Sequence, residues 1–118
     1  MMMHVVLFTP RPTIRDDERE RLARVLASAL DGIPSVRRYH VGRRVTLGTA
    51  YDRAAPLDFS YLVAIEFDDR NGLVEYLGHP QHEALGQLFY SSSERACAYD
   101  FETVSSDVVA ALTGWAGY

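Results

Sequence analysis

The order of strand-like and helical hydrophobic patterns limits the fold of this chain more than any other feature. Alternating or β-branched apolar residues predict strands, whereas apolar residues at helical spacing predict helices. The sequence predicts a strand over 4–9, a helix over 13–32, strands over 36–46 and 58–67, a helical region over 69–90 and a strand over 95–104. This β-α-β-β-α-β order is typical of a ferredoxin-like α+β sandwich, an antiparallel sheet with helices on one face.

The ends of the helices are marked by their residue types. Thr13 is expected to cap the first helix, and Gly32 is expected to end it. Pro80 should interrupt the second helical region, because proline disfavours helix at the preceding residue. A short terminal helix, capped by Ser105 or Ser106, should end at Gly114. Two aromatic residues near the C-terminus, Trp115 and Tyr118, are expected to pack on the body of the protein or on a partner subunit.

One face of the predicted sheet has no layer of chain left to cover it. Alternation places Val5 and Leu7 of the first strand on this face, together with Cys97, Tyr99 and Phe101 of the last strand. Leaving apolar surface in water costs about 25 cal/mol per Å². We therefore expect a homodimer in which a second copy covers this face of the sheet.

The opposite face of the sheet has room for a pocket. His4 lies on this face of the first strand, and Asp100 shares the face with two small residues, Ala96 and Ala98. Small side chains beneath a helix leave space that a ligand could fill. Residues 61, 63 and 65 of the third strand are expected to form its middle wall, with Tyr61 and Val63 among the ligand-binding residues.

The segment from Tyr76 to His82, YLGHPQH, concentrates side chains suited to proton transfer. It contains a phenol and two imidazoles, and histidine titrates near neutral pH. In the structural interpretation, His79 begins a helix at Pro80, while Tyr76 and His82 are core groups with satisfied hydrogen bonds. In the functional interpretation, His82 and Tyr76 are catalytic and His79 contacts a ligand. We expect no metal site, because no third ligand stands out beside the two histidines beyond Glu83 or Asp100.

Two stretches carry a resemblance to a known family. The opening MHVVLF (residues 3–8) and the HPxH pattern at 79–82 resemble the stress-responsive α/β-barrel (Dabb) family over nearly the whole chain. The resemblance implies a dimeric α+β barrel in which two sheets pair face to face. A plant cyclase of this family drives an aldol-type ring closure without a cofactor. Its catalytic groups match His4, Tyr76 and His82, and a late aspartate matches Asp100, which would orient His82.

Composition excludes several classes of function. A net charge of −4 argues against a nucleic-acid-binding surface. All twelve basic residues are arginines, so Schiff-base chemistry, a pyridoxal-phosphate anchor and a Walker A loop are excluded. Cys97 is the only cysteine, so no intrachain disulfide can form. We see neither a signal peptide nor a membrane-spanning stretch, and expect a single cytoplasmic domain over 1–118 that needs no cofactor.

Three functions remain open from the sequence. The first is a cofactor-free cyclase or isomerase that acts on a small carbonyl compound. The second is a non-catalytic binding or structural dimer associated with stress, and the third is a cofactor-independent oxygenase. Leu26 and Tyr61 stand where the plant cyclase has a tyrosine and a histidine, so we expect a different substrate. Fold alone does not decide among these functions.

Overall fold

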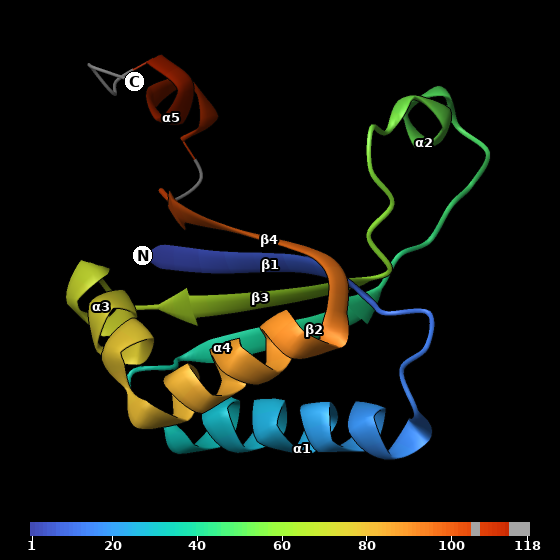
Figure 1. The fold of residues 1–118 in the computed structure, drawn as a ribbon. Helices are drawn as coiled ribbons and strands as arrows, with labels where there is room; N and C mark the ends of the chain where they lie inside the picture. Colours follow the sequence, from blue (N-terminus) through green and yellow to red (C-terminus); the bar gives the residue numbers. More distant parts are fainter. Residues whose placement is uncertain (105–106, 114–118) are drawn as a thin grey trace.

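The computed structural model describes residues 1–104 and 107–113 as a sheet covered by helices on one face. Its elements follow one another along the chain as shown in Figure 1. They are β1 (Met2–Pro10), α1 (Asp16–Gly32), β2 (Arg38–Arg43), α2 (Ala50–Ala54), β3 (Tyr61–Phe67), α3 (Arg70–Gly78), α4 (Pro80–Ser92), β4 (Ser93–Glu102) and α5 (Val108–Thr113).

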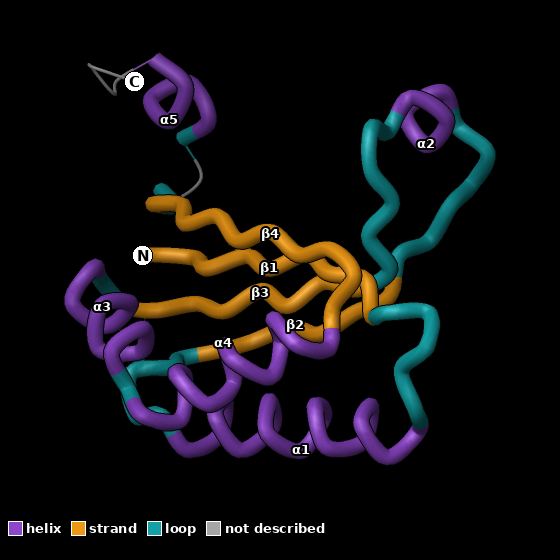
Figure 2. The backbone as a smooth tube through the Cα atoms, viewed as in Figure 1, coloured by secondary structure: helices purple, strands orange, loops and turns teal. Residues whose placement is uncertain are grey.

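The four strands form one antiparallel sheet in the order β2-β3-β1-β4. The two central strands are the first and third in sequence, as the predicted ferredoxin-like α+β sandwich requires. Helices α1 and α4 lie against one face of the sheet, and Figure 2 shows them as neighbours. In Figure 1, α2 and α5 project from the sheet on the side opposite α1.

Several boundaries differ from the sequence-based prediction. Helix α1 begins at Asp16 rather than after Thr13, because residues 11–14 form a turn closed by the bond from Ile14 N–H to Arg11 O (3.0 Å). Strand β2 is shorter than predicted, β3 begins at Tyr61 instead of residue 58, and β4 begins at Ser93. The predicted cap at Ser105 or Ser106 and the aromatic residues at 115 and 118 lie outside the described residues.

The connection between β2 and β3 contains a short helix, α2, that the sequence analysis did not predict. Thr49 caps this helix by accepting the backbone N–H of Asp52 (3.2 Å). The carboxylate of Asp52 in turn accepts the N–H groups of Thr49 (3.2 Å) and Leu47 (2.7 Å). Such a reciprocal capping box satisfies backbone donors locally, so even a five-residue helix can form.

The predicted break in the second helical region is confirmed. Helix α3 ends at Gly78, and α4 begins at Pro80. The backbone of His79 between them is extended, as expected for a residue before proline. Proline also suits the first position of a helix, where its missing N–H costs nothing. Two helices therefore meet at an angle where a single long helix could have formed.

The hydrophobic core lies between the sheet and the helices. Strand β3 contributes three fully buried side chains, Val63, Ile65 and Phe67, and α1 packs Leu26 and Leu30 against them. The opposite face of the sheet is different. Its residues share this face as predicted, and the strand register pairs Val5 with Tyr99 and Leu7 with Cys97. Tyr99 and Phe101 on this face remain 58% and 48% exposed.

Candidate active site

His4 lies on the helix-facing side of β1 and is almost fully buried. Its Nδ1 is 2.6 Å from an Asp100 carboxylate oxygen on the neighbouring strand. The register of β1 with β4 places these two residues directly opposite one another. The side chain of Asp100 is 44% exposed. A buried imidazole is thus linked to a carboxylate that reaches solvent, and the ionised carboxylate makes Nδ1 of His4 the donor.

The break at Pro80 brings Tyr76 and His82 together. Tyr76 comes from the last turns of α3 and is only 2% exposed, whereas the half-buried His82 comes from the first turn of α4. Their ring centroids are 4.7 Å apart, and the ring of His4 lies 5.9 Å from Tyr76 and 6.5 Å from His82. Three side chains from three separate elements therefore form one cluster.

The protonation pattern of His82 follows from its backbone contact. Its Nδ1 lies 3.1 Å from the carbonyl oxygen of Leu77. A carbonyl only accepts hydrogen bonds, so Nδ1 of His82 carries the proton in this contact. In the neutral imidazole Nε2 is then unprotonated and available as a base.

The structure does not bring every predicted residue into this cluster. His79 caps α4, because its Nδ1 accepts the backbone N–H of Gln81 (3.1 Å). Tyr61 stacks on Phe8, with centroids 5.3 Å apart, and its hydroxyl accepts a hydrogen bond from Arg19 (3.1 Å). Neither side chain lines the cavity beside His82. Local interactions already engage both side chains, since His79 caps a helix and Tyr61 stacks on an aromatic ring.

The expectation that Asp100 orients His82 is also corrected. Asp100 bonds His4, while the Leu77 carbonyl orients His82. Strand pairing is the physical reason, because a residue directly opposite its partner on one face of a sheet is within hydrogen-bond reach.

A cavity of about 400 Å³ opens beside the three rings. Of the predicted site residues, His4, Tyr76, His82, Val63, Ala96 and Ala98 line it. The sequence analysis placed the pocket beneath a helix but named no lining residue of α4 besides His82. A signal was present, because His82, Gly86 and Phe89 follow helical spacing and so share one face of α4. The missed lining residues include Leu77, Leu85, Gly86, Phe89 and Tyr90.

Burial shifts the pKa values of Tyr76 and His82, whose rings face each other. It raises the pKa of Tyr76 to about 12, so the phenol stays protonated at neutral pH. Burial also lowers the pKa of His82, and positive charge on His4 lowers it further, while the Leu77 carbonyl acts in the opposite direction. The cluster thus presents a neutral phenol donor and a neutral imidazole base in the same apolar site.

NMR titration of the His82 ring protons is expected to give a pKa below the ordinary value of 6.5. In His4→Gln this pKa should rise, because the substitution removes the positive charge that disfavours a second imidazolium. His40→Gln is the matched control. His40 of β2 pairs with Glu66 of β3 (3.1 Å), so its replacement should leave the pKa of His82 unchanged. An unchanged value in His4→Gln would contradict the coupling of the two rings.

The lowered pKa of His82 also predicts how folding stability depends on pH. The unfolded chain binds a proton at His82 near pH 6.5, whereas the folded protein binds it only at lower pH. The contribution of His82 is therefore fully present above pH 6.5 and is lost as pH falls through the folded pKa. Urea unfolding measured across this range should show a shallower acid dependence in His82→Ala. An equal slope in both proteins would contradict the lowered pKa.

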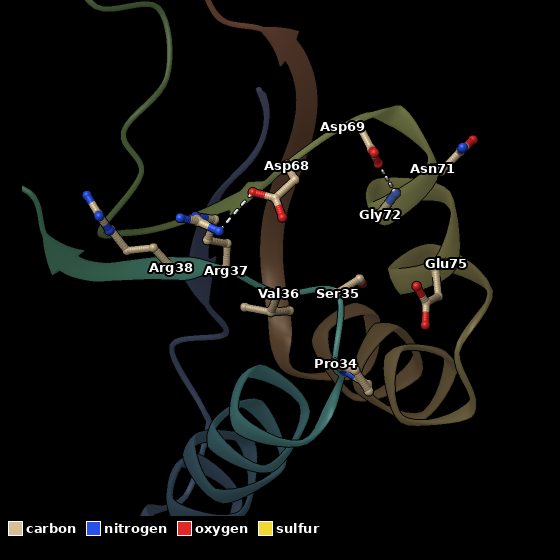
Figure 3. Close-up of a pocket in the computed structure, with 10 residues that line it drawn as sticks. All are labelled: Pro34, Ser35, Val36, Arg37, Arg38, Asp68, Asp69, Asn71, Gly72 and Glu75. Carbon is tan, nitrogen blue, oxygen red and sulfur yellow. Dashed lines mark hydrogen bonds and ion pairs between the residues drawn. The ribbon is translucent and has the colours of Figure 1, made fainter.

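A wider, more polar hollow of about 600 Å³ lies at the end of α1, between β2 and the start of α3 (Figure 3). Three of its charged groups are engaged: Arg37 pairs with Asp68 (3.1 Å), and Asp69 accepts the N–H of Gly72 (2.9 Å). Within residues 1–104 and 107–113, no three His, Cys, Asp or Glu side chains lie together as a metal site would require. Of these two hollows, the one beside His82 brings two imidazoles and a phenol together.

The sequence pattern of the family described as the stress responsive A/B barrel domain, Dabb, matches residues 2–103. The chain belongs to the Dabb family. A curated relative is the stress-response A/B barrel domain-containing protein HS1 of Arabidopsis thaliana, 20% identical over 102 residues that cover 86% of this chain and 89% of HS1. The Dabb assignment and the ferredoxin-like fold predicted from the sequence are confirmed.

Three solved structures show the same fold at low sequence identity. A dimeric ferredoxin-like protein from Thermobifida fusca is 22% identical, with 86% of this chain and 90% of that chain covered and a TM-score of 0.68. A hydroxynitrile lyase from Passiflora edulis is 12% identical (89% and 94% covered, TM-score 0.74). SnoaB, a cofactor-independent oxygenase from Streptomyces nogalater studied as a mutant, is 16% identical (91% and 96%, TM-score 0.64). Proteins of this fold thus include a dimer and two enzymes.

The helices in the described part of the chain are too short or too polar to span a bilayer.

Proposed function

We propose that this Dabb protein is a homodimer whose cavity performs cofactor-free acid/base chemistry, of the cyclase or isomerase type, on a small carbonyl compound. The observation that carries the proposal is the pairing of two complementary groups. The buried phenol of Tyr76 and the unprotonated Nε2 of His82 belong to rings 4.7 Å apart, at the edge of a cavity of about 400 Å³. A proton donor and a proton acceptor so placed can act on one substrate group.

The first step of such a reaction is abstraction of a proton from the carbon next to the carbonyl. Nε2 of His82 takes the proton, and the electron pair of the broken C–H bond moves toward the carbonyl oxygen. The Leu77 carbonyl stabilises the resulting imidazolium through Nδ1–H. Tyr76 donates a hydrogen bond to the oxygen where negative charge develops. The enolate can then attack a second carbonyl or regain the proton at another carbon.

His4 and Asp100 support this pair from the sheet. Asp100 holds the His4 ring through the 2.6 Å contact, so the ring keeps one orientation against Tyr76. Because Asp100 is partly exposed, the pair also connects the cavity to solvent. This arrangement can return a proton to the site after each turnover.

The proposal of a homodimer rests on the open face of the sheet. Its apolar side chains include the exposed Tyr99 and Phe101, and two half-buried residues of β1, Val5 and Leu7, lie beside them. A second copy is a suitable cover, since the same face presented by both subunits is the rule in two-fold dimers. The protein from Thermobifida fusca, which has the same fold, is dimeric.

Exchange of the methyl protons of acetophenone with D₂O tests the acid/base chemistry directly. Proton NMR should show that the wild-type protein accelerates the exchange over buffer. Tyr76→Phe should slow it by about 100-fold or more, as loss of one oxyanion donor does elsewhere. Folding should be little affected, because the Tyr76 hydroxyl bonds no other described residue and Phe keeps the ring. Equal exchange in both proteins would contradict the role of the phenol.

A non-catalytic binding dimer is the second candidate, since the cavity could hold a ligand without turning it over. Binding of a ligand beside His82 with no proton exchange would favour it. A cofactor-independent oxygenase is the third candidate, because SnoaB, which has the same fold, is such an enzyme. Consumption of dissolved oxygen in the presence of substrate would distinguish it.

A further inference from the structure

We infer that the cavity beside His82 binds an uncharged ligand, a hydrocarbon body that carries a single carbonyl or hydroxyl group, and rejects carboxylates, phosphates and ammonium compounds of the same size. This inference rests on the proposed function and narrows its substrate class.

The lining of the cavity contains no fixed countercharge for a charged ligand. None of the described residues that form its walls is Arg, Asp or Glu, and the chain has no lysine. Its ionisable side chains are the cluster of His4, Tyr76 and His82, together with Tyr90 and Cys97. A charge that leaves water without a partner loses several kcal/mol of hydration or more. An anion or an ammonium ion would have to lose its hydration in this cavity without an ion pair in return.

The charges just outside the cavity also disfavour a carboxylate or phosphate. One of them is Asp100, whose carboxylate bonds His4 and so already balances any positive charge on that ring. An incoming anion would approach this carboxylate through the His4 ring, and like charges repel. An ammonium group also lacks a partner, because no carboxylate lines the cavity and Asp100 is already engaged by His4.

The hydrogen-bonding groups of the cluster match one small polar group. The Tyr76 hydroxyl makes no hydrogen bond to another described residue and is free to donate. Nε2 of His82 is an acceptor, because Nδ1 bonds Leu77. A carbonyl oxygen beside an acidic C–H, or an alcohol, can use both groups at once. A carboxylate offers only acceptors and an ammonium only donors, so either would leave one group of the protein unpaired.

The remaining walls suit a hydrocarbon body. Leu26 of α1, Leu85 and Phe89 of α4, and Val6, Val63 and Ile65 of the sheet line the cavity. Sites of about this size, mostly apolar with a few convergent polar groups, are typical of small-molecule pockets. An aromatic ring or a short alkyl chain can therefore lie between α4 and the sheet, with its polar group at the histidines.

Three probes with the same ring and different head groups test the inference: acetophenone, benzoate and benzylamine. Binding at pH 7 is measured by NMR titration of the protein, with the ring signals of His82 as reporters. We expect acetophenone to shift these signals with an affinity at least about tenfold higher than benzoate or benzylamine. Equal or tighter binding of benzoate or benzylamine at the same signals would overturn the inference.

Two matched variants locate the binding. Ala98→Phe places a ring in the cavity from an exposed position on β4, and should abolish the acetophenone shifts. Ala84→Phe makes the same change at an exposed position of α4 that does not line the cavity, and should bind like wild type. Circular dichroism confirms that both fold. Shifts that persist in Ala98→Phe, or no shift with acetophenone in the wild type, would overturn the inference.

The test of the ligand class and the test of the proposed function can fail independently of each other. Acetophenone that binds but exchanges no methyl protons would support the ligand class and contradict the catalytic proposal. Selective binding of benzoate beside His82 would overturn the ligand class and leave acid/base chemistry on another substrate intact.

Discussion

Replacement of His82 by alanine is expected to abolish nearly all catalysed proton exchange, with a loss of about 100- to 10,000-fold. His82 is the base of the proposed reaction, and its Nε2 has no substitute in the cavity: the ring of His4 lies 6.5 Å away and is held by Asp100. The fold should be nearly unaffected. Within residues 1–104 and 107–113, the side chain of the half-buried His82 bonds a single backbone carbonyl, so we expect a loss below about 1 kcal/mol in the free energy of unfolding.

His79→Ala is the matched control, three residues earlier in the same segment. His79 caps α4 and does not line the cavity. Its loss should lower the free energy of unfolding by about 0.5–2 kcal/mol, as loss of other N-caps does, while proton exchange per folded molecule stays at the wild-type level. The two variants should therefore differ: His82→Ala loses activity, whereas His79→Ala loses stability. The reverse result would show that the cap and the base have been assigned to the wrong residues.

Leu7→Arg is expected to convert the proposed dimer into a monomer or an aggregate. Leu7 lies on the open face of β1, opposite Cys97 and beside Leu62 of β3. Between two sheets, an arginine here would be an unpaired buried charge, which costs roughly 3–5 kcal/mol for each uncompensated ion. A two-fold dimer carries the substitution twice. Sedimentation velocity at micromolar concentration measures the result.

Val74→Arg provides the control for added charge. Val74 is an exposed apolar residue of α3, 62% accessible, and lies outside the open sheet face. This variant should sediment as a dimer like the wild type. A wild-type protein that is already monomeric at micromolar concentration would contradict the proposed assembly. Dimer retained in Leu7→Arg would place the interface elsewhere.

The sequence analysis predicted the faces of the sheet well because strand alternation is local. His4 shares a face with Ala98 and Asp100, and Leu7 shares the opposite face with Cys97 and Tyr99, as predicted. The break before Pro80 was equally readable, since proline restricts the residue that precedes it. Boundaries were less predictable. The turn before Asp16 and the capping box of α2 depend on side-chain and backbone bonds that apolar periodicity does not report.

The sequence by itself determined which side chains could come together in a site. Local patterns predict the residues capable of proton transfer, the faces of the strands on which they lie, and the family. Only the tertiary structure decided which of them do meet. Asp100 bonds His4 rather than His82 because the register of β1 and β4 joins residues 96 positions apart. Of two histidines in one motif, His79 is used as a cap and His82 faces Tyr76, because the angle between α3 and α4 directs only the second toward the sheet. Register and interhelical angle are set by packing of the whole core, which no single segment specifies.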